Sequence, residues 1–221
     1  MDYVSLKDYL ISIGNKQLAE FTKPLLHSDY KVIGIYQPDL KRIVKEHAFD
    51  EDLRVEEFEL GEYFEIDYLY FAFSLKRIST LDEQLGFLKK QIRFAKSWAI
   101  TDSVPSFLKK MDFSHFESFF KSSYKSKFTF ERRMAYVLGL KFYEDERILK
   151  LLPSFGKAEE YMVMMAEAWL LSCIAIRFED EVYAYLSACD DLVLKRKAIS
   201  KISDSRRFNE ESKSRFKSLR G

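Results

Sequence analysis

Trp98 and Asp102 are the two side chains whose types and spacing first suggest chemistry. A separation of four residues places them one turn apart on the same face of a helix. A carboxylate beside the face of an indole ring is a place where positive charge is stabilised. The same pair also fits a structural role, in which Trp98 anchors the core and Asp102 pairs with a lysine or another polar group. Spacing alone leaves both interpretations open.

Arg133 and Trp169 are further candidates, and both have structural alternatives. Trp169 is the second of two tryptophans in the chain. Segment 158–178 around it is apolar on nearly every side, so a core position would also suit it. The guanidinium of Arg133 has paired N–H groups that can donate hydrogen bonds to a phosphate. The alternative role is a structural one, a salt bridge to Glu131 or Glu167.

Charge is unevenly spread along the chain, although the formal net charge is only +1. Residues 46–67 are strongly acidic, whereas residues 195–220 are strongly basic. A basic end of this kind can bind phosphates, and a solvated face balanced by acids from elsewhere is the alternative. The basic residues that we expect to face nucleic acid are Arg93, Lys96, Lys195, Arg196, Lys197, Arg206 and Arg207.

Composition favours long helices as the elements that position these side chains. Hydrophobic residues make up 47% and aromatic residues 16% of the 221 residues, so we expect a large core rich in Phe and Tyr. Seven glycines and four prolines are too few for the many tight turns of a β-sandwich or barrel. Cys173 and Cys189 lack CxxC spacing, which indicates buried free thiols, and we expect neither a metal nor an organic cofactor.

Helix starts recur roughly every 15 to 20 residues, each with an N-cap or first-turn signal ahead of an apolar stripe. Thr80 and Glu83 form a predicted capping box, and Pro105 is expected to kink or end the helix that begins at Ser97. Helices are predicted over 5–13, 15–26, 38–47, 50–58, 62–78, 80–94, 97–110, 112–124, 129–143, 145–152, 158–178, 179–188, 192–202 and 209–219.

Such a succession, joined by short polar turns, predicts helix-pair repeats of roughly 35 to 45 residues. We therefore expect a single all-α domain over residues 1–221, built as a stack of helix pairs; a compact irregular bundle is the alternative. No apolar run reaches the roughly 18 residues that a membrane-spanning helix needs, and the chain opens without a signal-like segment. A cytoplasmic location without a membrane partner is therefore expected.

Five short motifs follow one another along the chain. They are Gly34-Ile35-x-x-Pro38 within 30–43, Trp98-x-x-x-Asp102 within 97–103, Arg132-Arg133-x-Ala135 within 130–138, Met165-Ala166-x-x-Trp169 within 161–172, and the basic segment 197–207. Together and in this order, they resemble the AlkD-like family of DNA alkylation repair proteins. The resemblance covers roughly residues 25–210.

The resemblance implies a HEAT-like α-α superhelical solenoid whose concave face accepts duplex DNA. It implies hydrolysis of the N-glycosidic bond of cationic alkylated purines, such as 7-methylguanine and 3-methyladenine, by a protein that acts as a monomer. It assigns Trp98, Asp102, Arg133 and Trp169 to the cleft. The chain departs from the family at Leu25, where active relatives carry an aromatic side chain.

These four side chains also fit that reaction on chemical grounds. The leaving purine is already cationic, and the transition state moves positive charge onto the sugar. Asp102, shielded by aromatic walls, would stabilise that charge and orient the attacking water. Trp98 and Trp169 would hold the sugar and the cationic base, each contributing about 0.5 to 2 kcal/mol. Arg133 would bind a backbone phosphate.

Two other functions stay open at this point. A HEAT-like protein that binds branched or distorted DNA without hydrolysis is suggested by the small net charge and by Leu25, for which Tyr30 or Tyr36 would have to substitute. A helical scaffold for a protein partner is suggested by the acidic residues 46–67. Release of 7-methylguanine separates the first function from the second, and DNA binding at about 50 mM salt separates the second from the third.

Overall fold

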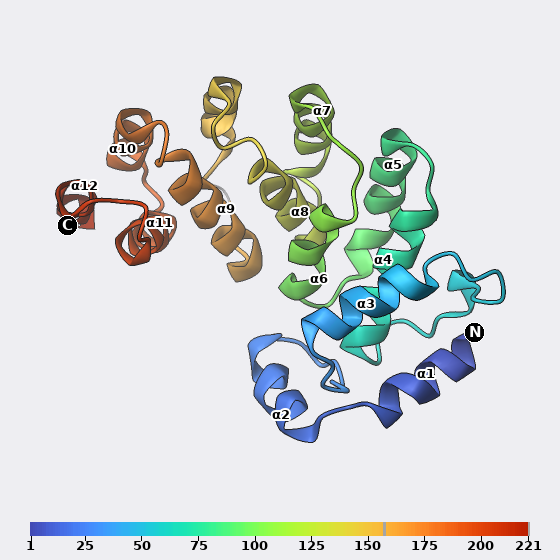
Figure 1. Ribbon diagram of the computed structural model, residues 1–221. Helices are drawn as coiled ribbons and strands as arrows, with labels where there is room; N and C mark the ends of the chain where they lie inside the picture. Colours follow the sequence, from blue (N-terminus) through green and yellow to red (C-terminus); the bar gives the residue numbers. More distant parts are fainter. Residues whose placement is uncertain (157, 221) are drawn as a thin grey trace. The chain divides into compact units, whose positions relative to one another are not determined.

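The computed structural model describes residues 1–156 and 158–220, and the regular structure there is helical (Figure 1). An isolated bridge between Lys31 and Tyr63 is the only β-type pairing found in that part of the chain. The all-α, helical-repeat class predicted from the sequence is confirmed. The chain divides into two compact units, unit 1 (Met1–Met111) and unit 2 (Asp112–Gly221), and each is described by itself. The single domain expected over residues 1–221 stays a prediction.

Side-chain caps begin several of the helices of unit 1. Asp2, Asn15 and Ser97 each accept a hydrogen bond from a first-turn N–H group, and Thr80 forms the expected capping box with Glu83. The α-helices are α1 Tyr3–Ser12, α2 Lys16–Leu25, α3 Gln37–His47, α4 Phe64–Arg77, α5 Leu81–Gln91 and α6 Trp98–Ser103, and the 3₁₀ turns are η1 Val55–Glu57, η2 Ile92–Phe94 and η3 Val104–Ser106.

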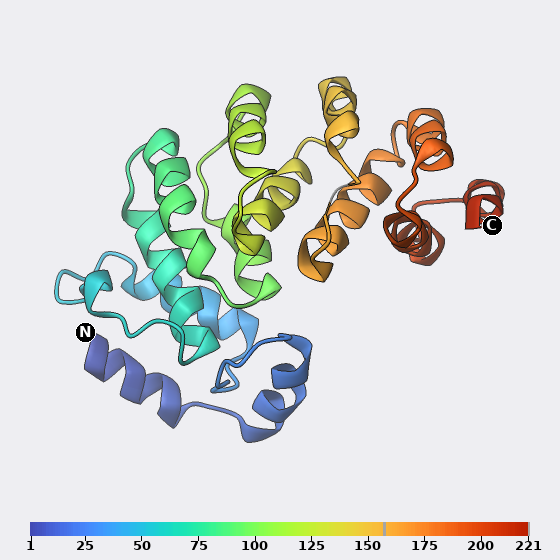
Figure 2. The ribbon, with the colours of Figure 1, turned by 180° about the vertical axis from the view of Figure 1, so that it is seen from behind.

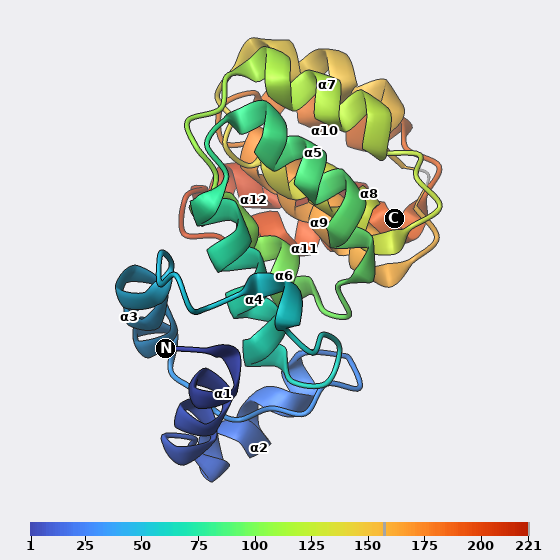
Figure 3. The ribbon, with the colours of Figure 1, turned by 90° about the vertical axis from the view of Figure 1, so that its right-hand side faces the viewer.

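Helix α4 is the centre of unit 1. It is buried along most of its length and packs against α3, α6 and η1. Figure 3 shows it between the α1–α2 pair and α5. Its apolar side chains are large, with Phe73 and Tyr68 among the most deeply buried residues of the chain. Burial of each such ring stabilises the fold by roughly 1.5 to 3 kcal/mol.

Two acidic side chains inside α4 hold the segment that follows α2, residues 30–36, which we call the Gly34 segment. Glu65, which is 1% exposed, accepts hydrogen bonds from the N–H groups of Ile33 (3.0 Å), Gly34 (2.8 Å) and Ile35 (3.3 Å). The hydroxyl of Tyr30 donates to Asp67 at 2.5 Å. Burial raises the pKa of both Tyr30 and Asp67.

Unit 2 is built from helix pairs in two layers. Figures 1 and 2 show α8, α9 and α11 side by side in one layer, with α7 and α10 in the other. The closest packing is of α9 against α8 and α11. The bounds are α7 Phe113–Ser123, α8 Thr129–Gly139, η4 Glu146–Ser154, α9 Tyr161–Ile174, α10 Glu179–Ala188, α11 Leu192–Asp204, α12 Glu210–Lys217 and η5 Ser218–Arg220.

Several of the predicted helices are shorter or tighter than expected. The helix that begins after Ser97 ends as an α-helix at Ser103, and a 3₁₀ turn carries Pro105. The helix expected over 145–152 is a 3₁₀ helix, because the N–H of Ile148 bonds back three residues to Asp145 rather than four. Within 50–58 only η1 is helical. Among the described residues, no helix is long and apolar enough to cross a membrane.

We expect Gly34→Ala to destabilise the fold strongly. Gly34 has φ +88°, which favours glycine, and an added Cβ would lie 2.1 Å from the backbone oxygen of Asn15. The free energy of unfolding should fall by about 3 kcal/mol or more in urea titrations. Gly86→Ala in α5 is the matched control, because its Cβ would meet no atom within 4 Å. The free energy of unfolding of Gly86→Ala should rise by about 0.5 to 1 kcal/mol. Equal effects of the two substitutions would show that the fold does not require glycine at position 34.

Candidate functional site

Trp98 is held at the start of α6 by the last turn of α2. Its ring Nε1 donates to the carbonyl of Leu25 at 2.8 Å, and the hydroxyl of Ser97 donates to the carbonyl of Leu26 at 2.9 Å. These two carbonyls are at the end of α2, where the last carbonyl groups of a helix have no N–H partner within the helix. The ring stays half-buried, so one bond orients it while part of its surface remains open to a ligand.

Asp102 lies one turn after Trp98, as the spacing predicted, and is also half-buried. Thr101 links the two positions: its hydroxyl lies 2.8 Å from the carbonyl of Trp98 and 3.2 Å from Oδ1 of Asp102. The carboxylate is therefore set on a short helix whose first residue is fixed by the bond to Leu25. Trp98 and Asp102 together form the candidate site of unit 1.

Helix α2 brings two exposed apolar side chains to the same region of unit 1, and one of them, Phe21, was not predicted as a site residue. Phe21 and Leu25 are four residues apart on α2, so they share a face, and both are exposed. The carbonyl of Leu25 is the one that binds Trp98. The (i, i+4) spacing was the available signal for Phe21. Of the two tyrosines named as substitutes for an aromatic at Leu25, Tyr30 is fully buried and Tyr36 is exposed.

The two basic residues expected to bind DNA in unit 1 differ in their surroundings. Lys96 has local partners: its Nζ donates to the carbonyl of Gly61 at 2.8 Å and lies 3.2 Å from a carboxylate oxygen of Asp29. Arg93 is exposed, with its guanidinium carbon 4.9 Å from the centroid of the Phe94 ring. Of the two residues, Arg93 is the more exposed.

Trp169 lies on the open surface of unit 2 rather than in its core. Helix α9 is otherwise largely buried, yet 37% of Trp169 is exposed. Its ring lines a hollow of about 380 Å³ that also contacts Lys201 and Arg207. Cys173 lines the same hollow, and both it and Cys189 are free thiols that are half-buried. The hollow combines an aromatic wall with two cationic side chains and one carboxylate, that of Asp204.

Further basic residues extend this surface along α11. The ammonium of Lys197 lies 5.7 Å from the centroid of the exposed Tyr161 ring, which precedes Trp169 by two turns of α9. Lys201 follows Lys197 by one turn of α11. We call Tyr161, Trp169, Lys197 and Lys201 the α9–α11 face. Tyr161 and Lys201 were not singled out from the sequence, although the spacings Tyr161–Trp169 and Lys197–Lys201 were visible there.

The other basic residues named from the sequence in unit 2 are mostly at the surface. Arg196 and Arg206 are exposed, and Nζ of Lys195 reaches the carbonyl of Ser187 at 3.5 Å. Arg207 lies over the ring of Tyr143, with its guanidinium carbon 5.4 Å from the ring centroid. Of this group, only Arg207 lines the hollow beside Trp169.

Arg133 is inside unit 2. It is 5% exposed, and its Nη1 donates to the carbonyl of Met162 at 2.5 Å. Met162 is in the first turn of α9, so the guanidinium joins α8 to the start of the helix that carries Trp169. The neighbouring Arg132 forms an ion pair with Glu160, just before α9. Both arginines therefore act on the same helix end.

A family model described as DNA alkylation repair enzyme matches residues 6–206, which is most of the chain. The protein belongs to this DNA alkylation repair family. The resemblance seen in the sequence is thereby confirmed, and family membership supports a role in DNA repair. No curated protein matches the sequence. The match includes both tryptophans, Asp102 and Arg133.

The described residues of this family member include no group of three or more His, Cys, Asp or Glu side chains placed to hold a metal ion.

The acidic residue nearest in sequence to Trp169 is Glu167, which is fully buried. Its Oε1 accepts a hydrogen bond from the N–H of Gly156, and its Oε2 has no partner among the residues that the structure describes. Burial raises the pKa of Glu167 to about 8.

The stability of unit 2 should fall as pH rises from about 4.5 to about 8. In this window native Glu167 keeps a proton that the unfolded chain releases, so raising the pH removes stability, on the order of 5 kcal/mol in total. Glu167→Gln keeps the acceptor for Gly156 but cannot ionise. Urea unfolding of this variant should show a flatter pH dependence and higher stability at pH 8.5 than the natural chain. If the free energy of unfolding changed with pH in the same way for both proteins, Glu167 would not be the group responsible.

Proposed function

We propose that this protein is a DNA glycosylase that hydrolyses the N-glycosidic bond of cationic alkylated purines, with 7-methylguanine and 3-methyladenine as substrates. The observation that carries the proposal is the pair Trp98 and Asp102. An indole oriented by its bond to the Leu25 carbonyl stands one turn from a half-buried carboxylate, in a chain of the DNA alkylation repair family.

Asp102 is proposed to stabilise the sugar as the base leaves. Because the alkylated base already carries positive charge, it departs as a neutral purine without prior protonation, and positive charge develops on the deoxyribose. A carboxylate set beside an aromatic ring and partly withdrawn from water stabilises that charge more strongly than one in bulk solvent. The same carboxylate orients the water that attacks the anomeric carbon. Trp98 presents its ring to the cationic nucleotide.

The α9–α11 face and Arg207 are proposed to bind the DNA in unit 2. Exposed aromatic rings with cationic side chains beside them suit a nucleic acid, because the rings contact sugars and bases while the cations contact phosphates. Trp169 and Arg207 line the same hollow, so one nucleotide unit can reach both. A modest net charge is compatible with this function when the cations are gathered on one face.

Arg133 is proposed to position α9 rather than to grip a phosphate. Its guanidinium is buried and bonded to the carbonyl of Met162, two turns before Trp169. This assignment replaces the phosphate clamp expected from the sequence. It explains how an arginine can be buried in α8, since a buried guanidinium needs carbonyl or carboxylate partners.

We expect Asp102→Asn to lower the release of 7-methylguanine from methylated duplex DNA by at least about 100-fold, because the amide cannot stabilise a cationic sugar. The base released in single-turnover reactions is the measurement. DNA binding should change much less, since the loss falls on the transition state.

Asp8→Asn on the exposed surface of α1 is the control for Asp102→Asn, and it should be as active as the natural chain. Base release by Asp102→Asn at the natural rate would rule out the proposed role. No release by the natural chain, even at high protein concentration, would rule out the glycosylase.

A second candidate function is recognition of distorted or branched DNA without hydrolysis. The observations that favour it are the aliphatic Leu25 at a position where active relatives carry an aromatic side chain, and the burial of Arg133, which removes one cation from the surface. Salt-sensitive binding of such DNA without base release would support it over the glycosylase.

Arg207→Ala should weaken binding of duplex DNA and reduce its salt dependence. Loss of one phosphate contact lowers the slope of log K against log salt by about 0.9. Fluorescence anisotropy at several salt concentrations measures both quantities. Arg177→Ala, an exposed arginine of unit 2 that does not line the hollow beside Trp169, is the matched control and should keep the natural slope. The same slope for both variants would show that Arg207 does not contact DNA.

A further inference from the structure

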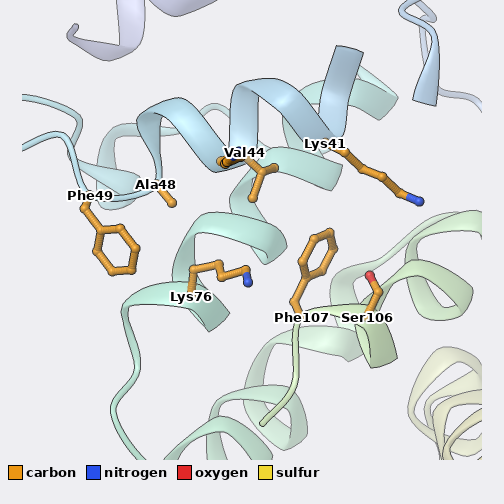
Figure 4. Close-up of a pocket in the computed structure, with 8 residues that line it drawn as sticks. Lys41, Val44, Ala48, Phe49, Lys76, Ser106 and Phe107 are labelled. Carbon is orange, nitrogen blue, oxygen red and sulfur yellow. The ribbon is translucent and has the colours of Figure 1, made fainter. Parts of the chain in front are cut away.

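Unit 1 contains a hollow of its own, which shares no residue with the site at Trp98 and Asp102. It has a volume of about 390 Å³, within the range of small-molecule sites, and lies between α3, the end of α4 and the turn after α6. Its floor is apolar and comes from Val44, Ala48 and Phe107, all of them buried. In Figure 4, Val44 on α3 and Ala48 just after this helix lie across the hollow from the ring of Phe107.

Three lysines surround this apolar floor. Lys41 and Lys45 come from α3 and Lys76 from the last turn of α4, and all three are exposed. No hydrogen bond or ion pair joins any of them to another described residue. In Figure 4 the side chain of Lys76 lies between the rings of Phe49 and Phe107. Three cations without a carboxylate partner around one hollow favour an anionic ligand.

Phe49 closes one end of the hollow and is held in an exposed position. It is 70% exposed, but its loop is fixed by Arg77, whose guanidinium donates to the carbonyls of Ala48 (2.6 Å), Leu53 (2.7 Å) and Asp50 (3.1 Å). An exposed aromatic ring on a fixed loop offers an apolar surface that a flat ligand can cover. The fixed loop also lowers the entropy lost when a ligand binds.

From this arrangement we infer that the hollow binds a nucleotide, with its base against the exposed ring of Phe49 and its phosphate near the lysines that line the hollow, Lys76 among them. A flat aromatic base matches the exposed ring of Phe49, and a phosphate matches the ammonium groups beside it. The nucleotide can be free in solution or be an unpaired nucleotide of a strand. This site does not depend on the proposed glycosylase, because it needs no alkylated base and no hydrolysis.

Titration of the full chain with adenosine 5′-monophosphate, followed by NMR of isotope-labelled Phe rings and by calorimetry, tests the inference. The signal of Phe49, assigned from Phe49→Ala, should shift on binding. Adenosine alone and inorganic phosphate alone should each bind at least about tenfold more weakly, because each satisfies only half of the hollow. Hexadeoxyadenylate tests the second source: a Phe49 shift at lower concentration than with the mononucleotide assigns the hollow to a strand, and a shift with the mononucleotide only assigns it to a free nucleotide.

Two variants with matched controls test the named contacts. Phe49→Ala and Lys76→Glu should each weaken binding by about tenfold, through lost stacking and through reversed charge. Ile11→Ala, an exposed apolar residue of α1, and Lys150→Glu, an exposed lysine of unit 2, should change it less than twofold. Unchanged affinity in Phe49→Ala, or shifts of Phe49 caused by decanoate or a Glu–Phe–Glu tripeptide but not by the mononucleotide, would overturn the inference.

Discussion

A single buried carboxylate holds unit 1 in the form that its candidate site needs. Glu65 in α4 accepts three consecutive N–H groups of the Gly34 segment, and each bond to a charged acceptor contributes about 1.5 to 3 kcal/mol. Without these donors, burial of the carboxylate would be strongly unfavourable. Because the Gly34 segment follows α2 closely, the same carboxylate helps to fix the helix end whose Leu25 carbonyl orients Trp98.

Much of the fold could be predicted because helical periodicity is a local property of the sequence. The capping box at Thr80 and the end of a regular helix before Pro105 followed from short-range chemistry. The helix expected over 145–152 is a 3₁₀ helix. Apolar spacing does not reveal whether a backbone N–H group bonds to the carbonyl three or four residues before it. The role of Glu65 was invisible, since its donors lie about 30 residues away in sequence.

The site was predicted in part, for a similar reason. The spacing of Trp98 and Asp102 placed them one turn apart, but the bond that orients Trp98 joins residues 73 positions apart. The apolar pattern around Trp169 suggested a core position equally well, whereas the ring is exposed. Arg133 shows the opposite case: the sequence suggested a phosphate contact or a salt bridge, whereas the side chain is buried and bonded to a carbonyl of the next helix. Which side of a helix faces a neighbour is decided by packing, which one sequence records only weakly.

Helix α6 spans only Trp98–Ser103, between the Ser97 cap and the 3₁₀ turn that contains Pro105. A helix of little more than one turn cannot spread a change of length over further turns. Insertion or deletion of one residue between Trp98 and Asp102 would rotate one side chain by about 100° relative to the other. This stretch is therefore constrained in length more than in composition. Ala99 and Ile100 can vary within their packing, but the count of residues between the indole and the carboxylate cannot.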